Sequence, residues 1–331
     1  MMSVMSAFRR KAYSVFFYRM ALGELLTILH SAILHLRFSF NNGKPGLEKE
    51  KLEYYLVKHC HILEKGLALP KPRKAFGQPK IKILIKRTRL YEAHYSETHI
   101  GCMVRDTLRE YLEFHANDLQ ALPKDFLSHI RIFIEEREPQ ASGGLKHLKK
   151  SEMVTLGPDR FREFLQCRHS LRNFSSVPVE DAVINEAISM ARHTPSVCNR
   201  QGWRVHYYSD KAIICELLSY QNGNAGFTES IDKLLIVTGS TKAFTRYEHN
   251  QLFIDGGLYS MNLMLSLHAV GLGSCPLNTC MPWFREKQIK NVARIACYER
   301  LIMMIAVGNL KDEFNVAQSE KYSLDRILKR H

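Results

Sequence analysis

The stretch from residue 168 to residue 204 constrains this chain more than any other. It opens with Arg168-His169-Ser170-Leu171-Arg172, which places two guanidinium groups, an imidazole and a hydroxyl within five residues. Arginine offers a planar fork of N–H donors and serine adds a short one, so the cluster suits a phosphate or another planar anion. Taken alone, the same cluster also fits an ordinary basic helix end.

The stretch closes with Thr194-Pro195-Ser196-Val197-Cys198-Asn199-Arg200-Gln201-Gly202-Trp203-Arg204, a turn-forming run rich in small polar groups whose backbone can approach a ligand. Between the two pieces, residues 178–193 have the apolar spacing of one amphipathic helix, with Glu180 or Asp181 near its start. We therefore expect this helix to bring two distant pieces of the chain to one site.

The pattern Arg-His-Ser-x-Arg, a helix, then Pro-Ser-x-x-Asn-x-Gln-x-Trp resembles the nitroreductase superfamily of FMN-dependent enzymes, and the resemblance extends over roughly residues 160–331. It implies an α+β fold, with a mainly antiparallel sheet flanked by helices and FMN at a homodimer interface. It implies no catalytic side chain, because the cofactor holds the electrons and the protein orients the partners. The flavin-binding residues carried over are Arg168, His169, Ser170, Arg172, Pro195, Ser196, Asn199, Gln201, Asn224, Pro276, Leu277, Asn278 and Lys321.

The resemblance also implies a role for each residue of the first cluster. Arg168 would bind the flavin phosphate, and His169 and Ser170 would line the ribityl and phosphate side. Arg172 would face the pyrimidine end of the ring, where a fixed cation stabilises the negative charge that reduction places there.

Four further parts of the chain complete the site that the resemblance implies. The loop from Pro195 to Gln201 would reach the cofactor from the partner subunit. The segment from Pro276 to Asn278 would lie near the ring, and Asn224 would lie at its pyrimidine edge, although Asn224 also fits a plain turn. Lys321 would add a second cation at the phosphate.

The chain departs from the family pattern at three positions. Gly202 stands where the family often has proline, which would leave the loop less rigid because glycine frees the φ angle that proline fixes. Asn278 replaces a glycine or glutamate, and Ser323 replaces a second base near the C-terminus. These departures put the efficiency of the flavin site in question.

Three strands and one long helix are predicted in this half. Residues 203–209 alternate apolar and polar side chains, and residues 234–237 and 301–307 are continuous apolar runs. A long apolar helix begins at Asp255, and residues 271–278 are interpreted as the loop that ends it. Its Gly-x-Gly follows a helix and not a strand, so it does not indicate a Rossmann dinucleotide fold.

The first half is basic, with 26 Lys and Arg against 15 Asp and Glu in residues 1–150. Its helical spacing predicts an all-helical region, and residues 138–150 read as a linker, giving domains 1–150 and 151–331. The positive surface is either simply solvated or meets an anionic partner such as lipid headgroups, and we do not favour nucleic acid. Residues 8–40 predict an amphipathic helix that packs on its own domain or lies on a membrane surface.

The eight cysteines form no C-x-x-C pair, so no metal site is expected. Reduced thiols and the absence of a signal-peptide pattern favour the cytoplasm.

The predicted function is an FMN-dependent NAD(P)H oxidoreductase. It would reduce a small organic acceptor (a nitroaromatic, a quinone or an unsaturated metabolite) by ping-pong hydride transfer at flavin N5. The alternatives are a flavin-dependent dehydrogenase or tailoring enzyme of a biosynthetic pathway, and a flavin-poor interaction protein.

Overall fold

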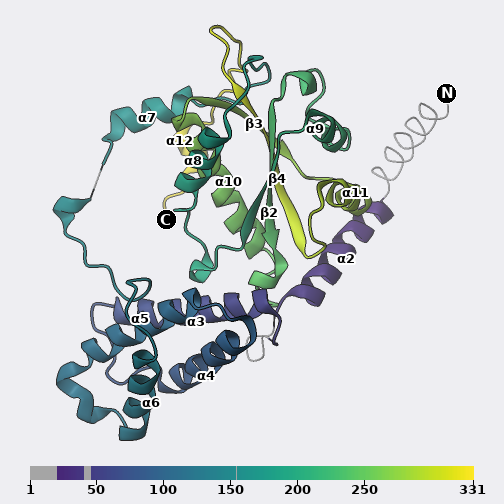
Figure 1. The fold of residues 1–331 in the computed structure, drawn as a ribbon. Coiled ribbons are helices and arrows are strands. Elements are labelled where there is room, and N and C mark those ends of the chain that lie inside the picture. Colours follow the sequence, from purple (N-terminus) through teal and green to yellow (C-terminus); the bar gives the residue numbers. More distant parts are fainter. Residues whose placement is uncertain (1–20, 41–45, 154) are drawn as a thin grey trace.

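The computed structural model describes residues 21–40, 46–153 and 155–331, and Figure 1 shows their arrangement. The helices of the first half are α2 (Ala21–Phe38), α3 (Lys49–Leu67), α4 (Gln78–Tyr95), α5 (His99–Phe114), η1 (Ala116–Ala121), α6 (Lys124–Glu135) and η2 (Lys150–Glu152). The second half contains α7 (Pro158–Cys167), α8 (Asp181–Ala191), η3 (Val197–Asn199), β1 (Trp203–Tyr208), α9 (Lys211–Leu218), η4 (Thr228–Ser230), β2 (Lys233–Ser240), η5 (Thr241–Ala243), α10 (Gln251–Ala269), β3 (Leu272–Asn278), α11 (Trp283–Ala293), β4 (Glu299–Asn309) and α12 (Leu324–Ile327).

The four strands form one antiparallel sheet in the order β1-β2-β4-β3. In Figure 1, α8 and α10 lie on one side of this sheet and α9 and α11 lie on the other. The α+β fold expected from the sequence, with a mainly antiparallel sheet flanked by helices, is confirmed.

Alternation along the central strands builds a separate apolar core on each face of the sheet. Leu234 and Ile236 of β2 pack with α9 and α11, whereas Leu235 and Val237 pack with α8 and α10. Successive side chains of a strand point to opposite faces, so a strand covered on both faces needs an apolar residue at every position. The continuous run Leu234–Val237 meets that need.

The helical region lies beside the sheet-containing half and shares a core with it. Its core gathers apolar side chains from α3, α4, α5 and α6, and the same cluster contains Phe244, which follows η5, and Leu252 of α10. Polar contacts cross the same boundary, since the Arg204 guanidinium donates to the Tyr54 hydroxyl (2.9 Å) and the Lys242 ammonium pairs with the Glu48 carboxylate (2.5 Å). Helix α3 is therefore the element that joins the two halves.

Glu64 and Gly66 of helix α3 both contact other parts of the helical region. A Cβ atom on Gly66 would lie 2.5 Å from the Phe76 ring, so only glycine lets the ring pack there. The Glu64 carboxylate accepts hydrogen bonds from the Thr107 hydroxyl (3.3 Å) and from the Gly144 amide (3.2 Å). The hydrogen bond from the Gly144 amide attaches the segment after α6 to helix α3.

Several predicted elements differ in detail from the structure. Residues 271–278, interpreted as a loop, contain the edge strand β3, and the long apolar helix begins at Gln251 and not at Asp255. Two predicted segments lie in part outside the described residues: residues 8–20 of the N-terminal helix, and residues 41–45, which follow it.

Within the described ranges, no helix is long and apolar enough to cross a membrane. The division at residue 150 stays a prediction, and helix α2 lies against the sheet-containing half.

Candidate functional site

The Arg168–Arg172 segment runs alongside strand β3. The Leu171 amide donates to the Ser274 carbonyl oxygen (2.9 Å), and Ser170 forms a parallel bridge with Ser274. Leu171 is buried, and a Cβ atom on Gly273 would lie 2.5 Å from its side chain. Within the Gly-x-Gly run, Gly273 therefore leaves room for the Leu171 side chain. The burial of Leu171 determines the positions of the polar residues on either side of it.

The segment carries positive charge that the described residues do not neutralise. One Arg168 nitrogen, Nη1, is buried and has no hydrogen-bond partner, and no ion pair is formed by Arg168 or Arg172 within the part of the chain that the structure describes. Burial raises the pKa of the Cys275 thiol, and the charges of Arg172 and Arg168 oppose that rise. Burial lowers the pKa of His268, and the Arg168 charge lowers it further. An anion placed here would satisfy the orphaned donor.

A second loop reaches the far end of β3. The Gln221 side-chain amide, which is buried, donates to the Asn278 carbonyl oxygen (3.0 Å). Asn224 is also buried, and its amide nitrogen donates to the Thr228 hydroxyl (2.8 Å) within its own turn. The structure thus places the Asn224 loop beside Asn278. Gln221 makes that connection, which local sequence patterns do not indicate because the contact joins residues 57 positions apart in the chain.

The loop from Pro195 to Gln201 lies at the other end of helix α10. The Ser196 hydroxyl accepts a hydrogen bond from the Gln201 amide (2.9 Å), and the Asp255 carboxylate accepts one from the Val197 amide (3.2 Å). Pro195, Asn199 and Gln201 are exposed. An internal hydrogen bond holds the loop, and three of its predicted flavin-binding residues are exposed to solvent.

The backbone of this loop is strained and strongly held. Cys198, Asn199 and Gln201 have φ values of 50°, 52° and 50°, in the left-handed region that non-glycine residues rarely adopt. Arg200 is buried, and its guanidinium donates to both oxygens of Glu248 (2.9 and 2.8 Å) and to the Ala243 carbonyl oxygen (2.7 Å). These bonds hold the loop in a conformation that it would not adopt alone.

Gly202 does not loosen the loop in the way that the sequence suggested. A Cβ atom there would lie 2.8 Å from the Ala243 Cβ and 3.2 Å from the Phe244 ring. The position is buried, and the Gly202 carbonyl oxygen accepts a hydrogen bond from the Ser240 amide (2.7 Å). Glycine is present because the chain has no room for a side chain, and the rigidity comes from Arg200 and Asp255.

Helix α10 separates the two groups of predicted residues within one chain. Asp255, near its start, holds the loop from Pro195 to Gln201, whereas His268, near its end, contacts Phe164 (ring centroids 4.8 Å apart) and lies near Arg168. Asp255 and His268 are thirteen positions apart, so they lie about 20 Å apart along the helix. The Arg168–Arg172 segment is thus brought to β3, while the loop from Pro195 to Gln201 lies toward the start of α10.

Lys321 lies in the exposed segment that follows β4. Its ammonium group donates to the Ser319 carbonyl oxygen (3.0 Å), and within the described ranges no hydrogen bond or ion pair connects it to the Arg168–Arg172 segment. The beginning of the same segment does approach that cluster, because Leu310, Phe314 and Val316 line a small cavity with Arg168 and His169.

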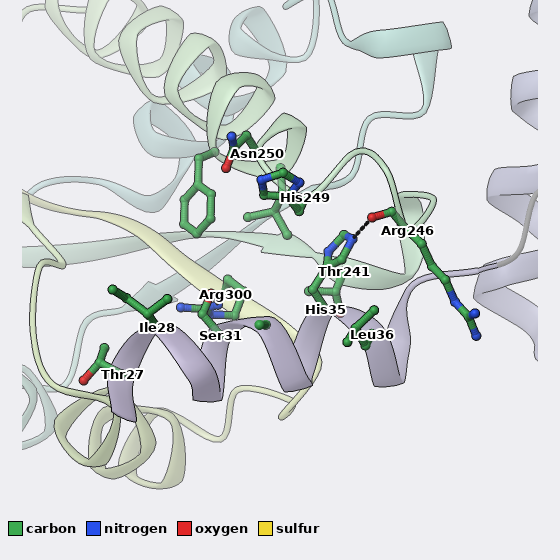
Figure 2. A pocket seen from close by; sticks show the side chains of 13 residues that line it. Thr27, Ile28, Ser31, His35, Leu36, Thr241, Arg246, His249, Asn250 and Arg300 are labelled. Atoms are coloured by element: carbon green, nitrogen blue, oxygen red, sulfur yellow. Dashed lines mark hydrogen bonds between the residues drawn. The ribbon is translucent and has the colours of Figure 1, made fainter. Parts of the chain in front are cut away.

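A cavity of about 540 Å³ lies elsewhere, between α2 and the start of α10 (Figure 2). It is lined by Thr27, Ile28, Ser31, Ala32, His35, Leu36, Thr241, Arg246, His249, Asn250, Leu252, Phe253 and Arg300, and by none of the predicted flavin-binding residues. Arg300 is already paired with Glu286 (2.9 Å), and His35 donates to the Arg246 carbonyl oxygen (3.1 Å). Size alone does not make this cavity the anion site, because among the described residues the buried guanidinium nitrogen without a hydrogen-bond partner belongs to Arg168.

The comparison with protein families supports the resemblance seen in the sequence. Residues 165–225, which contain both the Arg168 cluster and the loop from Pro195 to Gln201, match the model of the nitroreductase family. Residues 165–225 are therefore similar to the nitroreductase family. The match indicates a general role as an oxidoreductase.

Three solved structures illustrate the similarity. A nitroreductase family protein from Streptococcus pneumoniae TIGR4 is 20% identical (TM-score 0.45), and the match covers 52% of this chain and 100% of that one. A nitroreductase-like protein from Streptococcus mutans is 20% identical (TM-score 0.45), with coverages of 52% and 98%. An FMN-dependent nitroreductase from Clostridium difficile R20291 is 17% identical (TM-score 0.44), with coverages of 51% and 98%.

Proposed function

We propose that this nitroreductase-like protein is an FMN-dependent oxidoreductase that takes electrons from NAD(P)H and passes them to a small organic acceptor. The observation that carries the proposal is the buried Arg168 nitrogen without a partner, in a segment whose two arginines no carboxylate neutralises within the described chain. A phosphate satisfies such a donor, because charge-assisted hydrogen bonds from arginine to phosphate are strong and directional. FMN, when bound, supplies hydride transfer at its ring.

The residues of the first cluster have separate tasks in this proposal. Arg168, with His169 and Ser170, binds the phosphate and the ribityl chain. Arg172 places a fixed positive charge beside the pyrimidine edge, which favours electron uptake by the ring. The segment from Pro276 to Asn278 lies along the ring, positioned by its pairing with β4 and by the Gln221 amide.

The proposed active form is a homodimer, because the two groups of predicted residues lie at opposite ends of α10. The exposed face of this helix is apolar and includes Phe253, Ile254, Leu258 and Met261. In an isologous dimer the same face of both copies is buried. Two α10 helices packed antiparallel would bring the loop from Pro195 to Gln201 of one copy to the Arg168 cluster of the other.

Dehydrogenation of a biosynthetic intermediate remains the second candidate, because it would use the same residues in the same places. The two candidates differ in the electron donor. Purified protein that is yellow and is bleached anaerobically by NADH or NADPH favours the reductase. A yellow protein that neither nucleotide bleaches favours the dehydrogenase, and a protein that FMN cannot colour contradicts both.

The Arg168→Gln variant tests the phosphate assignment. Loss of a charge-assisted hydrogen bond, worth about 1.5–3 kcal/mol, should weaken FMN binding at least about tenfold in a fluorescence-quenching titration. Arg131→Gln, at an exposed position on α6, is the matched control and should bind FMN like the wild type. Equal FMN affinity of Arg168→Gln and the wild type, with unchanged circular dichroism, would overturn the assignment. Lys321→Ala, measured separately, decides whether the C-terminal cation takes part.

A further inference from the structure

Helix α2 is amphipathic with its polar side facing the protein. The Ser31 hydroxyl accepts a hydrogen bond from the Arg300 guanidinium (2.5 Å), and the His35 imidazole donates to the Arg246 carbonyl oxygen (3.1 Å), as Figure 2 shows for the His35 contact. One turn earlier, the Thr27 hydroxyl lies 3.4 Å from the Trp283 amide and accepts from it. Thr27, Ser31 and His35 are spaced four residues apart, so they form one stripe along the helix.

The opposite side of α2 is an exposed apolar face. A helix turns by about 100° per residue, which places one set of residues roughly opposite the Thr27–Ser31–His35 stripe. This outward face consists of Leu22, Leu25, Leu26, Leu29 and Ile33. Its leucine and isoleucine residues are 36% to 58% exposed. The exposed Arg37 lies at the edge of this face, one turn after Ile33. Within the described chain nothing covers the face.

This arrangement is the reverse of an ordinary surface helix, which buries its apolar side and solvates its polar side. The polar contacts to Arg300, Arg246 and Trp283 prevent α2 from rolling over to hide its leucines. In Figure 1, α2 lies along the outer edge of the molecule, on the side away from α7 and α8. An apolar face held outward at the edge of a protein marks an interaction surface.

The sequence before α2 indicates what covers the face. Residues 1–20 contain Arg9, Arg10, Lys11 and Arg19 and no acidic residue, and they include the aromatic residues Phe8, Tyr13, Phe16, Phe17 and Tyr18. Basic and aromatic residues beside an apolar helix face are typical of segments that lie in the headgroup region of a membrane. The basic residues would be attracted to anionic lipids.

We propose that α2 docks this protein on an anionic lipid surface, with its outward apolar face in the headgroup–acyl boundary and the basic residues 9–19 at the lipid phosphates. The protein would lie on the membrane and not cross it. This inference does not depend on the flavin assignment, because none of the flavin-binding residues lies on α2.

The test is flotation of the full-length protein with lipid vesicles. Wild-type protein should float with vesicles of phosphatidylcholine that contain about one third phosphatidylserine, and less with phosphatidylcholine alone. The Leu25→Glu/Leu29→Glu variant places two charges at the centre of the outward face and should lower the partition coefficient at least about tenfold. Ile83→Glu/Ile132→Glu is the matched control, since these isoleucines of α4 and α6 are 48% and 55% exposed, and it should float like the wild type.

Two further variants separate the charge from the apolar face. Replacing Arg9, Arg10 and Lys11 by glutamine should remove the preference for phosphatidylserine and leave the remaining binding insensitive to salt. The proposal is overturned if wild-type protein floats with neither vesicle type, or if Leu25→Glu/Leu29→Glu floats as well as the wild type. It is also overturned if the wild type does not float and Leu25→Glu/Leu29→Glu changes the oligomeric state in light scattering, which would identify a second copy as the occupant. If only a variant that lacks residues 1–20 floats, the proposal is also overturned, because that segment itself would then cover the outward face.

Discussion

At the scale of single residues, the ion pair between Arg200 and Glu248 controls the loop that carries Pro195 to Gln201. The Arg200 guanidinium is buried and also donates to the Ala243 carbonyl oxygen, so the pair connects three pieces of backbone. Burial alone would raise the pKa of Glu248. Hydrogen bonds from Arg200 and Thr245 outweigh that effect and lower its pKa to about 2. Stability of the loop is therefore linked to pH.

The sign of this linkage follows from the lowered pKa. A carboxyl whose pKa is lower in the folded state stabilises the fold above its unfolded pKa, and the contribution is lost as the pH falls toward the folded pKa. The shift from 4.5 to about 2 corresponds to about 3 kcal/mol, lost between about pH 5 and pH 2. Glu248→Gln should be less stable at pH 7 and should lose less stability between pH 7 and pH 3.5 in urea unfolding. Glu113→Gln, at an exposed position on α5, should follow the wild type. A wild-type pH dependence in Glu248→Gln would contradict the linkage.

At the scale of elements, the sequence predicted the helices and the three strands with apolar patterns. It did not predict β3, because Gly273, Ser274 and Pro276 have little strand propensity. The strand forms all the same, since β4 is its only neighbouring strand in the sheet and an edge position tolerates proline. The Arg168 cluster and its position after a helix could be predicted from local pattern. Its pairing with Ser274 and the contact between Gln221 and Asn278 could not, because they depend on how distant segments pack.

The position of Gly202 provides a test at the scale of elements. Gly202→Ala would place its methyl group 2.8 Å from the Ala243 Cβ and 3.2 Å from the Phe244 ring, at the junction of the loop with β1. Overpacking of this kind should destabilise the protein by about 1–3 kcal/mol in urea unfolding. Gly257→Ala in α10 is the control, because no atom lies within 4 Å of its Cβ position and alanine is the better helix former. Equal stability of Gly202→Ala and Gly257→Ala would show that the loop has room that the structure does not indicate.

At the scale of the whole molecule, the length of α10 makes one chain insufficient for the proposed site. The Arg168 cluster lies near His268 and the loop from Pro195 to Gln201 contacts Asp255, and these two positions of α10 lie about 20 Å apart along the helix. Local hydrogen bonds determine the position of each residue group within one chain. A site that uses both groups therefore has to be completed by a second copy, and α10 presents the apolar face with which that copy would pack.

Mixed dimers can test this assembly directly. Arg168→Gln removes the phosphate contact from one group, and Pro195→Trp fills the exposed surface of the other, so each variant alone should bind little FMN. In a mixed dimer of the two variants, one composite site contains both changes and the other contains neither. Co-expressed, differently tagged chains purified as the mixed dimer should therefore recover about half of the wild-type flavin per chain, measured by absorbance after reconstitution. If both groups served a cofactor within the same chain, no site of the mixed dimer would be intact and the flavin would stay absent. Flavin at the wild-type level in Pro195→Trp alone would remove the loop from the site.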